Sequence, residues 1–253
     1  MKNLIHFFLM GILLNSCTPK TNPLVIGHRG AKGHLAENTL PSIDKALKLG
    51  VDGVEIDIFR CASGELVVFH DQILDHLTNA TGYIEQLDLD SIRKIDVLNG
   101  FTIPTLAEVL DLIDGKVFLN IELKGSETAL PTIELLQQYF QKGVWTADKI
   151  LVSSFNWEEL KLFYEHNQDV PLAILTEDDP LDAIPVAKAL QAKAINPDFS
   201  SLNPNNISKI KSAGLQIFAW TVNKPEDIAS LIDLGIDGII TDFPERVPKR
   251  QDN

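Results

Sequence analysis

The amino-acid sequence predicts an α/β fold, and within that class a (β/α)8 TIM barrel with a β-hairpin extension of its second strand and a small cap segment. From Leu24 onward, short runs rich in Val and Ile alternate with amphipathic stretches. Continuous apolar runs of this kind are typical of parallel strands that are buried on both faces. Eight strands with their helices in about 230 residues match the size of a TIM barrel.

The eight predicted strands are short, apolar and separated by polar or amphipathic sequence. They cover residues 24–27, 53–58, 117–123, 150–154, 172–175, 194–197, 216–221 and 238–241.

The stretches between the strands have the spacing of amphipathic helices, in which apolar residues recur at i, i+3 and i+4. In the stretch 39–49, for example, Leu40, Ile43 and Leu47 fall on one stripe. Pro225 stands at the first position of its helix, where proline is well tolerated. The predicted helices cover residues 39–49, 105–113, 133–140, 157–164, 181–190, 205–213 and 225–234.

Two similar joints between a helix and a strand support a repeated unit. Residues 49–54 read Leu-Gly-Val-Asp-Gly-Val and residues 234–239 read Leu-Gly-Ile-Asp-Gly-Ile, each with a Gly where a helix should stop. The alternative fold is an open, doubly wound sheet. Its usual Gly-x-Gly-x-x-Gly pattern after a strand is missing from this sequence.

One segment interrupts the alternation of strands and helices. The runs 54–60 and 65–70 are separated by only four residues, which is too short for a parallel crossover. They should therefore form an antiparallel hairpin that extends the second strand and returns His70 close to Asp57. The long stretch 71–102 should form the cap, with a short helix around residues 90–95.

The first sixteen residues have the features of a secretory signal. Lys2 is followed by an apolar stretch, 4–14, that is too short to span a membrane as a helix. The sequence Leu-Asn-Ser-Cys at 14–17 resembles a bacterial lipobox. We therefore expect a lipoprotein signal peptide at 1–16, a lipidated Cys17, a linker at 17–23 and a single barrel domain at 24–253. The protein would be exported and anchored by lipid to a bacterial cell membrane, on its periplasmic or cell-surface side.

The net charge argues against one class of partner, and the cysteine content argues against a disulfide bond. The formal net charge is −13 and the acidic residues are dispersed, which argues against nucleic acid as a partner, because nucleic-acid binding depends on contacts from Lys and Arg to phosphates. Only Cys17 and Cys61 are present. With Cys17 lipidated, no intramolecular disulfide is expected, and Cys61 is interpreted as a small packing residue.

Candidate catalytic residues gather at the carboxyl ends of the first three predicted strands, which is where TIM-barrel enzymes place their active sites. They are His28 and Arg29 after the first strand, Glu55 and Asp57 on the second, His70 at the end of the hairpin, and Glu122 and Lys124 on the third.

The acidic residues in this set predict a site for a divalent cation. Glu55 and Asp57 are two residues apart on a strand, so their side chains point to the same face. Together with Glu122 they would repel one another in a low-dielectric interior unless a cation or protons were bound. Carboxylate ligands without Cys favour Mg²⁺ or Ca²⁺. The alternative is a purely structural ion pair between Glu122 and Lys124.

Several short motifs follow one another along residues 24–247. They are His28-Arg29-Gly30, Glu37-Asn38-Thr39, Glu55-x-Asp57, Val-Val-Phe-His-Asp at 67–71 and Ile-Glu-Leu-Lys at 121–124, together with the weaker segments 103–106, 220–223 and 238–244. In their order and spacing these motifs resemble the glycerophosphodiester phosphodiesterase family over essentially all of residues 24–247.

This resemblance implies a role for each matching residue. It implies that Glu55, Asp57 and Glu122 bind the metal, and that His28 and His70 form an acid–base pair. It also implies phosphate contacts for Arg29 and Lys124, and it places Glu37 and Trp220 near the reacting centre. The resemblance further implies hydrolysis of a small glycerophosphodiester to glycerol 3-phosphate and an alcohol, through a cyclic phosphate. The pKa of His, near 6.5, suits proton transfer in both directions.

Three alternative functions remain open at this stage. A related barrel phosphodiesterase could act on lysophospholipids or sphingomyelin, which would require an apolar channel near the cap. A barrel glycosidase would use paired carboxylates but would not need the two histidines and the basic residues. A non-catalytic binding lipoprotein would not need the complete set of candidate catalytic residues.

Overall fold

The computed structural model describes residues 22–249 of the 253-residue chain. The predicted signal peptide and the predicted lipid attachment at Cys17 lie outside these residues.

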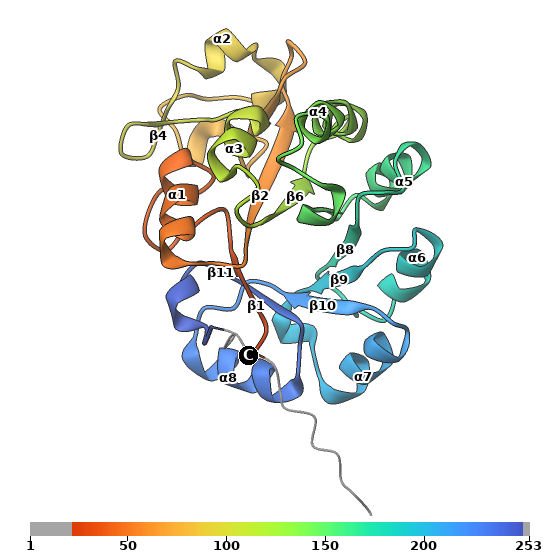
Figure 1. The fold of residues 1–253 in the computed structure, drawn as a ribbon. Coiled ribbons are helices and arrows are strands. Elements are labelled where there is room, and N and C mark those ends of the chain that lie inside the picture. Colours follow the sequence, from red (N-terminus) through yellow and green to blue (C-terminus); the bar gives the residue numbers. More distant parts are fainter. Residues whose placement is uncertain (1–21, 250–253) are drawn as a thin grey trace, which may run out of the picture.

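Within the described residues, eight parallel strands form a closed barrel, as predicted. β1 pairs with β11 on one side and with β2 on the other, and this closes the ring. Figure 1 shows the strands at the centre with helices around them. The barrel strands are β1 (Leu24–Gly27), β2 (Gly53–Arg60), β6 (Phe118–Leu123), β7 (Ile150–Ser154), β8 (Leu172–Thr176), β9 (Ala194–Pro197), β10 (Gln216–Ala219) and β11 (Gly238–Thr241).

The helices outside the barrel begin and end at residues with suitable capping chemistry. Thr105 and Glu108 form a capping box at the start of α3, and Thr39 accepts a hydrogen bond from the backbone N–H of Ser42 at the start of α1. The two similar joints noted in the sequence have the same geometry, since Gly50 and Gly235 both end a helix at φ 73°. The helices are α1 (Leu40–Leu49), α3 (Leu106–Ile113), α4 (Ala129–Gln141), α5 (Trp157–His166), α6 (Ala183–Ala189), α7 (Pro204–Ser212) and α8 (Pro225–Leu234).

Most predicted boundaries agree with the structure to within two residues, and the start of α4 differs by four. α4 begins at Ala129, four residues earlier than predicted, because the carboxylate of Glu159 accepts a hydrogen bond from the N–H of Ala129 and Pro131 falls in the first turn. β10 ends at Ala219, two residues earlier than predicted, although the backbone N–H of Trp220 still donates to Pro197 O of β9 at 3.1 Å.

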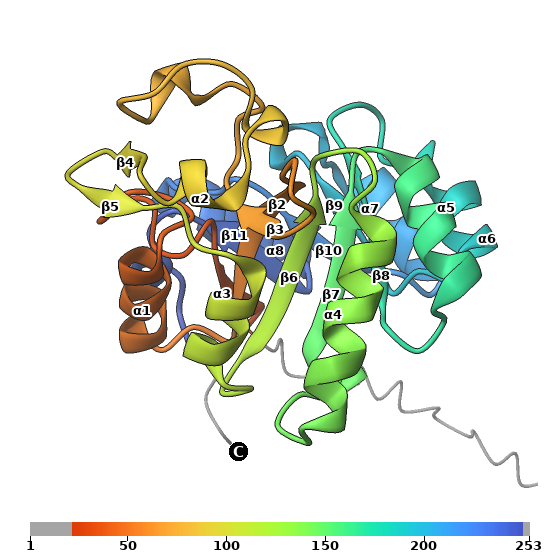
Figure 2. The ribbon, with the colours of Figure 1, turned by 90° about the horizontal axis from the view of Figure 1, so that it is seen from above.

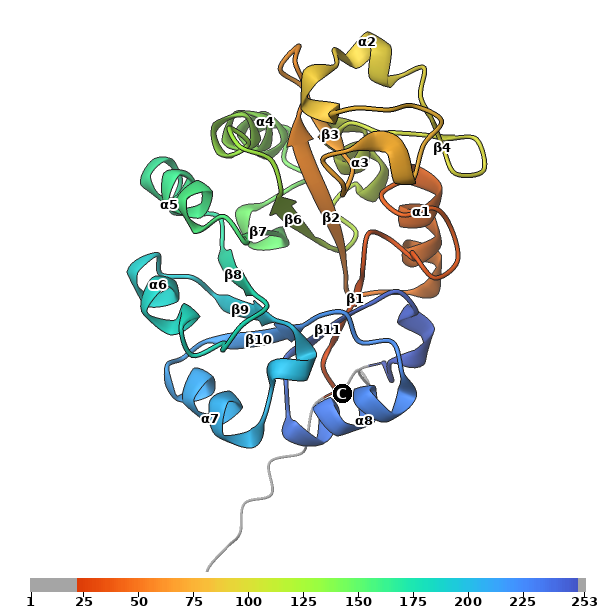
Figure 3. The same ribbon diagram turned by 180° about the vertical axis from the view of Figure 1, so that it is seen from behind.

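The predicted hairpin is present and extends β2 beyond the barrel. β2 pairs in antiparallel fashion with β3 (Leu66–Val68), and Figure 3 shows β2 as a long arrow that reaches toward the cap. The ladder ends at Val68, so β3 is shorter than the predicted run 65–70. The backbone N–H of Phe69 still donates to Asp57 O at 3.0 Å, which brings the following residue, His70, beside Asp57.

The cap has its own apolar cluster, separate from the core between barrel and helices. The cluster includes Phe59 and Phe69 from the hairpin, and Cys61 is buried among them, as the packing interpretation requires. Figure 2 shows the cap over one rim of the barrel. The predicted cap helix is α2 (Leu89–Ile92), shorter than expected, and an unpredicted hairpin of β4 (Asp96–Val97) and β5 (Phe101–Thr102) follows it.

The rest of the apolar core consists of two parts, one between the barrel and its helices and one inside the barrel. Alternate residues of the strands, such as Val54 and Ile56, pack outward against the helices. A smaller cluster, which includes Ile26, Phe218 and Ile240, fills the barrel interior. Among residues 22–249, no helix has both the length and the apolar character needed to cross a membrane.

Candidate active site

Three buried carboxylates lie together at the carboxyl ends of β2 and β6. The two strands are paired in parallel, with Glu55 opposite Asn120 and Asp57 opposite Glu122. The exposed fractions of Glu55, Asp57 and Glu122 are only 4%, 1% and 8%. One carboxylate oxygen from each lies within 4.8 Å of the others. The period of two along a strand therefore aims Glu55 and Asp57 into the barrel, and sheet pairing adds Glu122.

The electrostatics of this acidic trio fit a divalent cation. Burial, followed by the charges of Asp57 and Glu122, raises the pKa of Glu55 well above its ordinary value. Burial and the charge of Asp57 raise the pKa of Glu122 to about 8. Oε1 of Glu122 is buried and has no hydrogen-bond donor, although Lys124 Nζ lies 3.2 Å away. A hard cation would satisfy this oxygen and remove the repulsion, so these residues fit Mg²⁺ or Ca²⁺.

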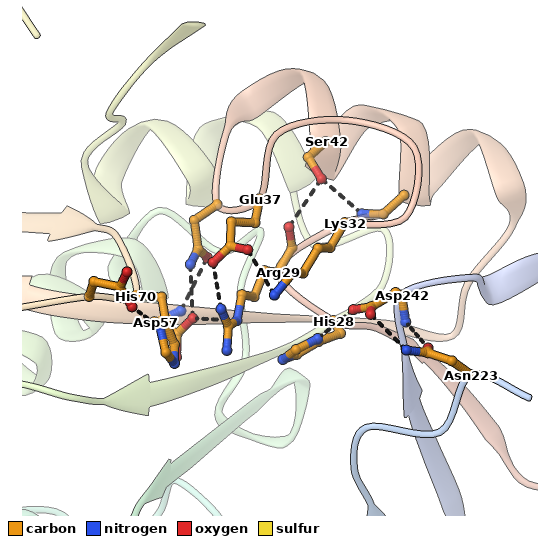
Figure 4. A network of polar contacts seen from close by, with 12 residues as sticks. His28, Arg29, Lys32, Glu37, Ser42, Asp57, His70, Asn223 and Asp242 are labelled. Atoms are coloured by element: carbon orange, nitrogen blue, oxygen red, sulfur yellow. Dashed lines mark hydrogen bonds and ion pairs between the residues drawn. The ribbon is translucent and has the colours of Figure 1, made fainter. Parts of the chain in front are cut away.

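His28 follows β1 and is held by a carboxylate from the neighbouring strand end. Its Nδ1 lies 2.6 Å from Oδ1 of Asp242, which follows β11. The amide of Asn223 donates to the other oxygen of Asp242 at 2.7 Å, as Figure 4 shows. Because a carboxylate only accepts, the proton of a neutral His28 ring lies on Nδ1, and Nε2 keeps its lone pair. Burial lowers the pKa of His28, and Asp242 partly offsets that effect.

His70 has the same arrangement and lines the same pocket as His28. Its Nδ1 lies 2.6 Å from Oδ1 of Asp71, and its Nε2 lies 3.1 Å from Nζ of Lys124. An ammonium group only donates, so the lone pair of His70 is again on Nε2. Burial lowers the pKa of His70, while the charge of Asp57 raises it.

Arg29 is held between two carboxylates rather than projecting freely into the pocket. Its Nη1 donates to Glu37, and its Nε lies 3.2 Å from Oδ2 of Asp57. Its backbone has φ 50°, in the left-handed region, which lets its N–H donate to Oε2 of Glu55 at 2.9 Å. Glu37 also pairs with Lys32 at 2.8 Å, so it lies behind Arg29 and orients it (Figure 4).

A pocket of about 100 Å³, called the inner pocket below, brings the catalytic candidates together. Trp220 forms part of its wall, with its indole N–H donating to Asn196 O at 2.8 Å and its ring edge-on to Phe155 at 5.5 Å. The candidates in its lining are His28, Arg29, Glu55, His70, Glu122, Lys124 and Trp220. Asp57 is not in the lining but lies 3.2 Å from Arg29, which is. Glu37 is not in the lining either.

Comparison with known proteins agrees with this geometry. A sequence profile of the glycerophosphoryl diester phosphodiesterase family matches residues 28–246. The chain belongs to this family. A glycerophosphodiester phosphodiesterase of Caldanaerobacter subterraneus subsp. tengcongensis is 34% identical over 230 residues, which is 88% of this chain and 95% of that protein. A glycerophosphodiester phosphodiesterase of Bacillus altitudinis is 33% identical over 236 residues, which is 89% and 96% of the two chains.

A solved structure has the same fold, and its sequence identity to this chain is close to that of the two relatives above. It is an Oleispira antarctica phosphodiesterase in complex with the product sn-glycerol-3-phosphate, with a TM-score of 0.82, 30% identity and coverage of 89% of this chain and 95% of that one. The chain is therefore an enzyme, a glycerophosphodiester phosphodiesterase, and this excludes the non-catalytic binding protein and the glycosidase considered above.

Several residues of this phosphodiesterase site were not assigned a role from the sequence. Asp242 and Asn223 lie in the segments 238–244 and 220–223, which were noted only as family-like. Asp71 follows His70 directly, and Asn38 donates to Oδ2 of Asp57 at 2.8 Å. All of them act on another functional side chain through a hydrogen bond. The only sequence signal for such partners was their presence inside the quoted motifs.

Proposed function

We propose that this phosphodiesterase hydrolyses small, water-soluble glycerophosphodiesters to glycerol 3-phosphate and an alcohol by two-histidine acid–base catalysis. The observation that carries the proposal is that His28 and His70 line one pocket, each with Nδ1 held by a carboxylate and the lone pair on Nε2. The product bound to the Oleispira antarctica relative supports the choice of glycerol 3-phosphate.

The proposed reaction has two half-reactions in which the histidines exchange roles. In the first, the glycerol 2-hydroxyl attacks phosphorus while one imidazole takes its proton. The bond from phosphorus to the alcohol oxygen breaks, and the other imidazole protonates that oxygen. In the second, water opens the cyclic phosphate, and each imidazole performs the opposite transfer. Both lowered pKa values keep an appreciable share of neutral imidazole at neutral pH, which the base requires.

The charged side chains around the histidines would hold the phosphate. A divalent cation bound by Glu55, Asp57 and Glu122 would supply charge neutralisation at the phosphoryl oxygens. Arg29 and Lys124 would add positive charge at fixed positions, because Arg29 is clamped by Glu37 and Lys124 lies 3.2 Å from Glu122. A preorganised group of this kind needs little rearrangement when negative charge builds up.

The substrate is more consistent with a water-soluble diester than with a lysophospholipid or sphingomyelin. Long acyl chains would need an apolar channel near the cap. The cavity that adjoins the cap and shares His70 and Lys124 with the inner pocket has polar residues such as Asp71, Gln72 and Glu85 in its lining, and of the described residues only Phe59 and Ile73 are large apolar residues there.

The deciding experiment is turnover by chelator-treated protein with Mg²⁺ or Ca²⁺ added back. The substrates would be glycerophosphodiesters with different alcohols, together with a lysophospholipid and sphingomyelin. We expect turnover of glycerophosphodiesters that disappears with chelator and returns with one of the two cations. Turnover confined to the lipids, or full turnover in excess chelator with no metal in the protein, would contradict the proposal.

We also propose that the enzyme is exported and attached to a bacterial membrane through lipid on Cys17. The support for this is the lipobox-like sequence at 14–17 and the apolar stretch before it.

A further inference from the structure

Next to the inner pocket lies a larger cavity of about 550 Å³, called the outer cavity below. It lies between the cap and the loop that joins β6 to α4, and its lining includes Phe59, Glu85 and Gly125. The two cavities share His70 and Lys124. A diester has two arms, and the inner pocket has room for little beyond the reacting centre. The outer cavity is of the size that binds small molecules and opens directly from the catalytic groups.

We propose that the outer cavity binds the alcohol arm of the substrate, and that Glu85 makes it favour alcohols that carry an ammonium group, such as choline or ethanolamine esters. This inference rests on the proposed function, since it needs a diester bound across His70.

Of the two acidic side chains that line the outer cavity within the described residues, Asp71 and Glu85, Glu85 is the one that faces a ligand there. The carboxylate of Asp71 is engaged by the His70 ring at 2.6 Å. The ammonium of Lys124 lies 3.2 Å from Glu122 and 3.1 Å from His70, so its charge is directed toward the inner pocket. Glu85, in the single-turn helix η2 (Ile84–Gln86), accepts a hydrogen bond from the neutral amide of Gln72 at 2.9 Å.

The carboxylate of Glu85 lies over Gly125, at the wall of the outer cavity. A Cβ at Gly125 would lie 2.8 Å from Cδ1 of Phe59 and 2.9 Å from Oε1 of Glu85. Both groups therefore occupy the space beside Gly125, which a side chain at that position would fill. A carboxylate at the cavity wall attracts an ammonium group through its negative charge. In choline and ethanolamine esters the ammonium is two carbons from the ester oxygen, so it would enter this cavity when the phosphate is held beside His70.

The test compares kcat/KM for glycerophosphocholine and glycerophosphoethanolamine with kcat/KM for glycerophosphoglycerol, whose alcohol is uncharged. The proteins are the full chain with its metal, as wild type, Glu85→Gln and Glu85→Lys. Glu127→Gln and Glu127→Lys are the matched controls. Glu127 is 76% exposed, lies on the same β6–α4 loop and pairs with Arg60 outside the cavity.

We expect the wild type to favour the ammonium substrates at low salt. The ratio of ammonium to uncharged kcat/KM should fall about fivefold in Glu85→Gln, the size expected for one partly exposed charge pair, and further in Glu85→Lys. High salt should reduce the wild-type preference, because the cavity is open to solvent. The Glu127 variants should keep the wild-type ratio.

Two outcomes would overturn the inference: no preference in the wild type, or an unchanged ratio in both Glu85 variants, which includes equal losses on charged and uncharged substrates. In each of these cases the wild type still turns over glycerophosphodiesters. If it turned over none of them, the proposed function itself would have failed.

Discussion

At the scale of single residues, the rings of His28 and His70 are each held by an Asp carboxylate at Nδ1, although the two carboxylates come from different parts of the chain. Asp71 is the residue next to His70, whereas Asp242 reaches His28 from the last barrel strand. In both cases the carboxylate fixes the proton on Nδ1 and leaves Nε2 for chemistry. Two predictions test these pairs.

The first prediction is that both histidines are essential. His28→Ala and His70→Ala should each lower kcat by about 10²–10⁴-fold, because each variant lacks either the acid or the base in both half-reactions. The double variant should be little worse than either single variant, since the two groups act as a unit. His34→Ala is the control, because His34 pairs with the half-exposed Glu245 at 3.0 Å and does not line the inner pocket. Near-wild-type kcat in either single variant would contradict the mechanism.

The second prediction is that Asp242 positions His28. Asp242→Asn should lower kcat at least roughly tenfold, as is typical when the partner of a functional side chain is lost. The hydrogen bond and the charge of Asp242 raise the pKa of His28, so their loss should lower it and shift the limb of the pH–rate profile governed by His28 toward lower pH. Asp44→Asn, on the exposed face of α1, is the control. An unshifted profile with wild-type kcat would show that Asp242 is not needed.

At the scale of secondary-structure elements, one buried carboxylate joins two helices of the barrel. Glu159 in α5 accepts hydrogen bonds from the backbone N–H of Glu127 at 2.9 Å and of Ala129 at 3.0 Å, at the start of α4. Thr128, the residue before α4, makes no side-chain capping bond. A negative charge at this end of a helix also interacts favourably with the helix dipole. The loop from Lys124 to Thr128 thus depends on a side chain from the next helix.

The third prediction follows from this contact. Glu159→Ala should lower the free energy of unfolding by about 1–3 kcal/mol, because it leaves backbone N–H groups unsatisfied in a buried position. Urea unfolding of the metal-loaded protein measures this change. Glu158→Ala is the matched control on the same turn, since the side chain of Glu158 is 87% exposed. Equal stabilities for the two variants would mean that Glu159 is not the cap of α4.

At the scale of the whole molecule, the raised pKa values of Glu55 and Glu122 lower the stability of the metal-free fold at neutral pH. The pKa of Glu122 is raised to about 8 from an ordinary value of 4.5, so the folded protein binds more protons than the unfolded chain between these values. The contribution of Glu122 to the free energy of unfolding is therefore fully present below pH 4.5, the pKa of the unfolded chain, and is lost as the pH rises to about 8, the pKa in the folded protein. A bound cation would take the place of the protons.

The fourth prediction concerns this linkage. Without metal, Glu122→Gln should gain thermal stability relative to the wild type, and the gain should grow from about pH 5 to about pH 8. Adding Ca²⁺ or Mg²⁺ should raise the Tm of the wild type more at the higher pH, and should raise the Tm of the variant less. The pairwise comparison removes the contribution of His28 and His70, whose lowered pKa values act in the opposite direction. A constant Tm difference across this pH range would rule out the linkage.

The fifth prediction concerns the proposed anchor and the direction in which the site faces. β1 begins at Leu24 at the end of the barrel opposite the active site, and Asn22 donates to Lys249 O there at 2.8 Å. Five residue steps from Cys17 to Asn22 span at most about 18 Å, so an anchored barrel would hold its active site away from the membrane. Cys17→Ser should abolish lipid incorporation and release the protein from membranes, while the purified variant keeps wild-type turnover. Incorporation of a labelled fatty acid into the Ser variant would contradict the anchor.

The sequence by itself determined the strands, most helix boundaries and the candidate catalytic residues. These features are local. The period of two along a strand puts Glu55 and Asp57 on one face, and the Gly residues at 50 and 235 stop their helices through their own backbone freedom. The acidic trio was also predictable, because neighbouring strands of a barrel bring their carboxyl ends together.

Only the tertiary structure decided which groups hold these residues in place. β1 lies beside β11 only after the barrel has closed, and that closure brings Asp242 to His28 across almost the whole length of the chain. The hydrogen bond from the backbone N–H of Arg29 to Glu55 likewise joins the turn after β1 to the next strand of the barrel, 26 residues away. Hydrogen bonds act over about 3 Å, so their partners depend on how distant segments finally pack, whereas secondary structure depends on residues within one turn or one strand.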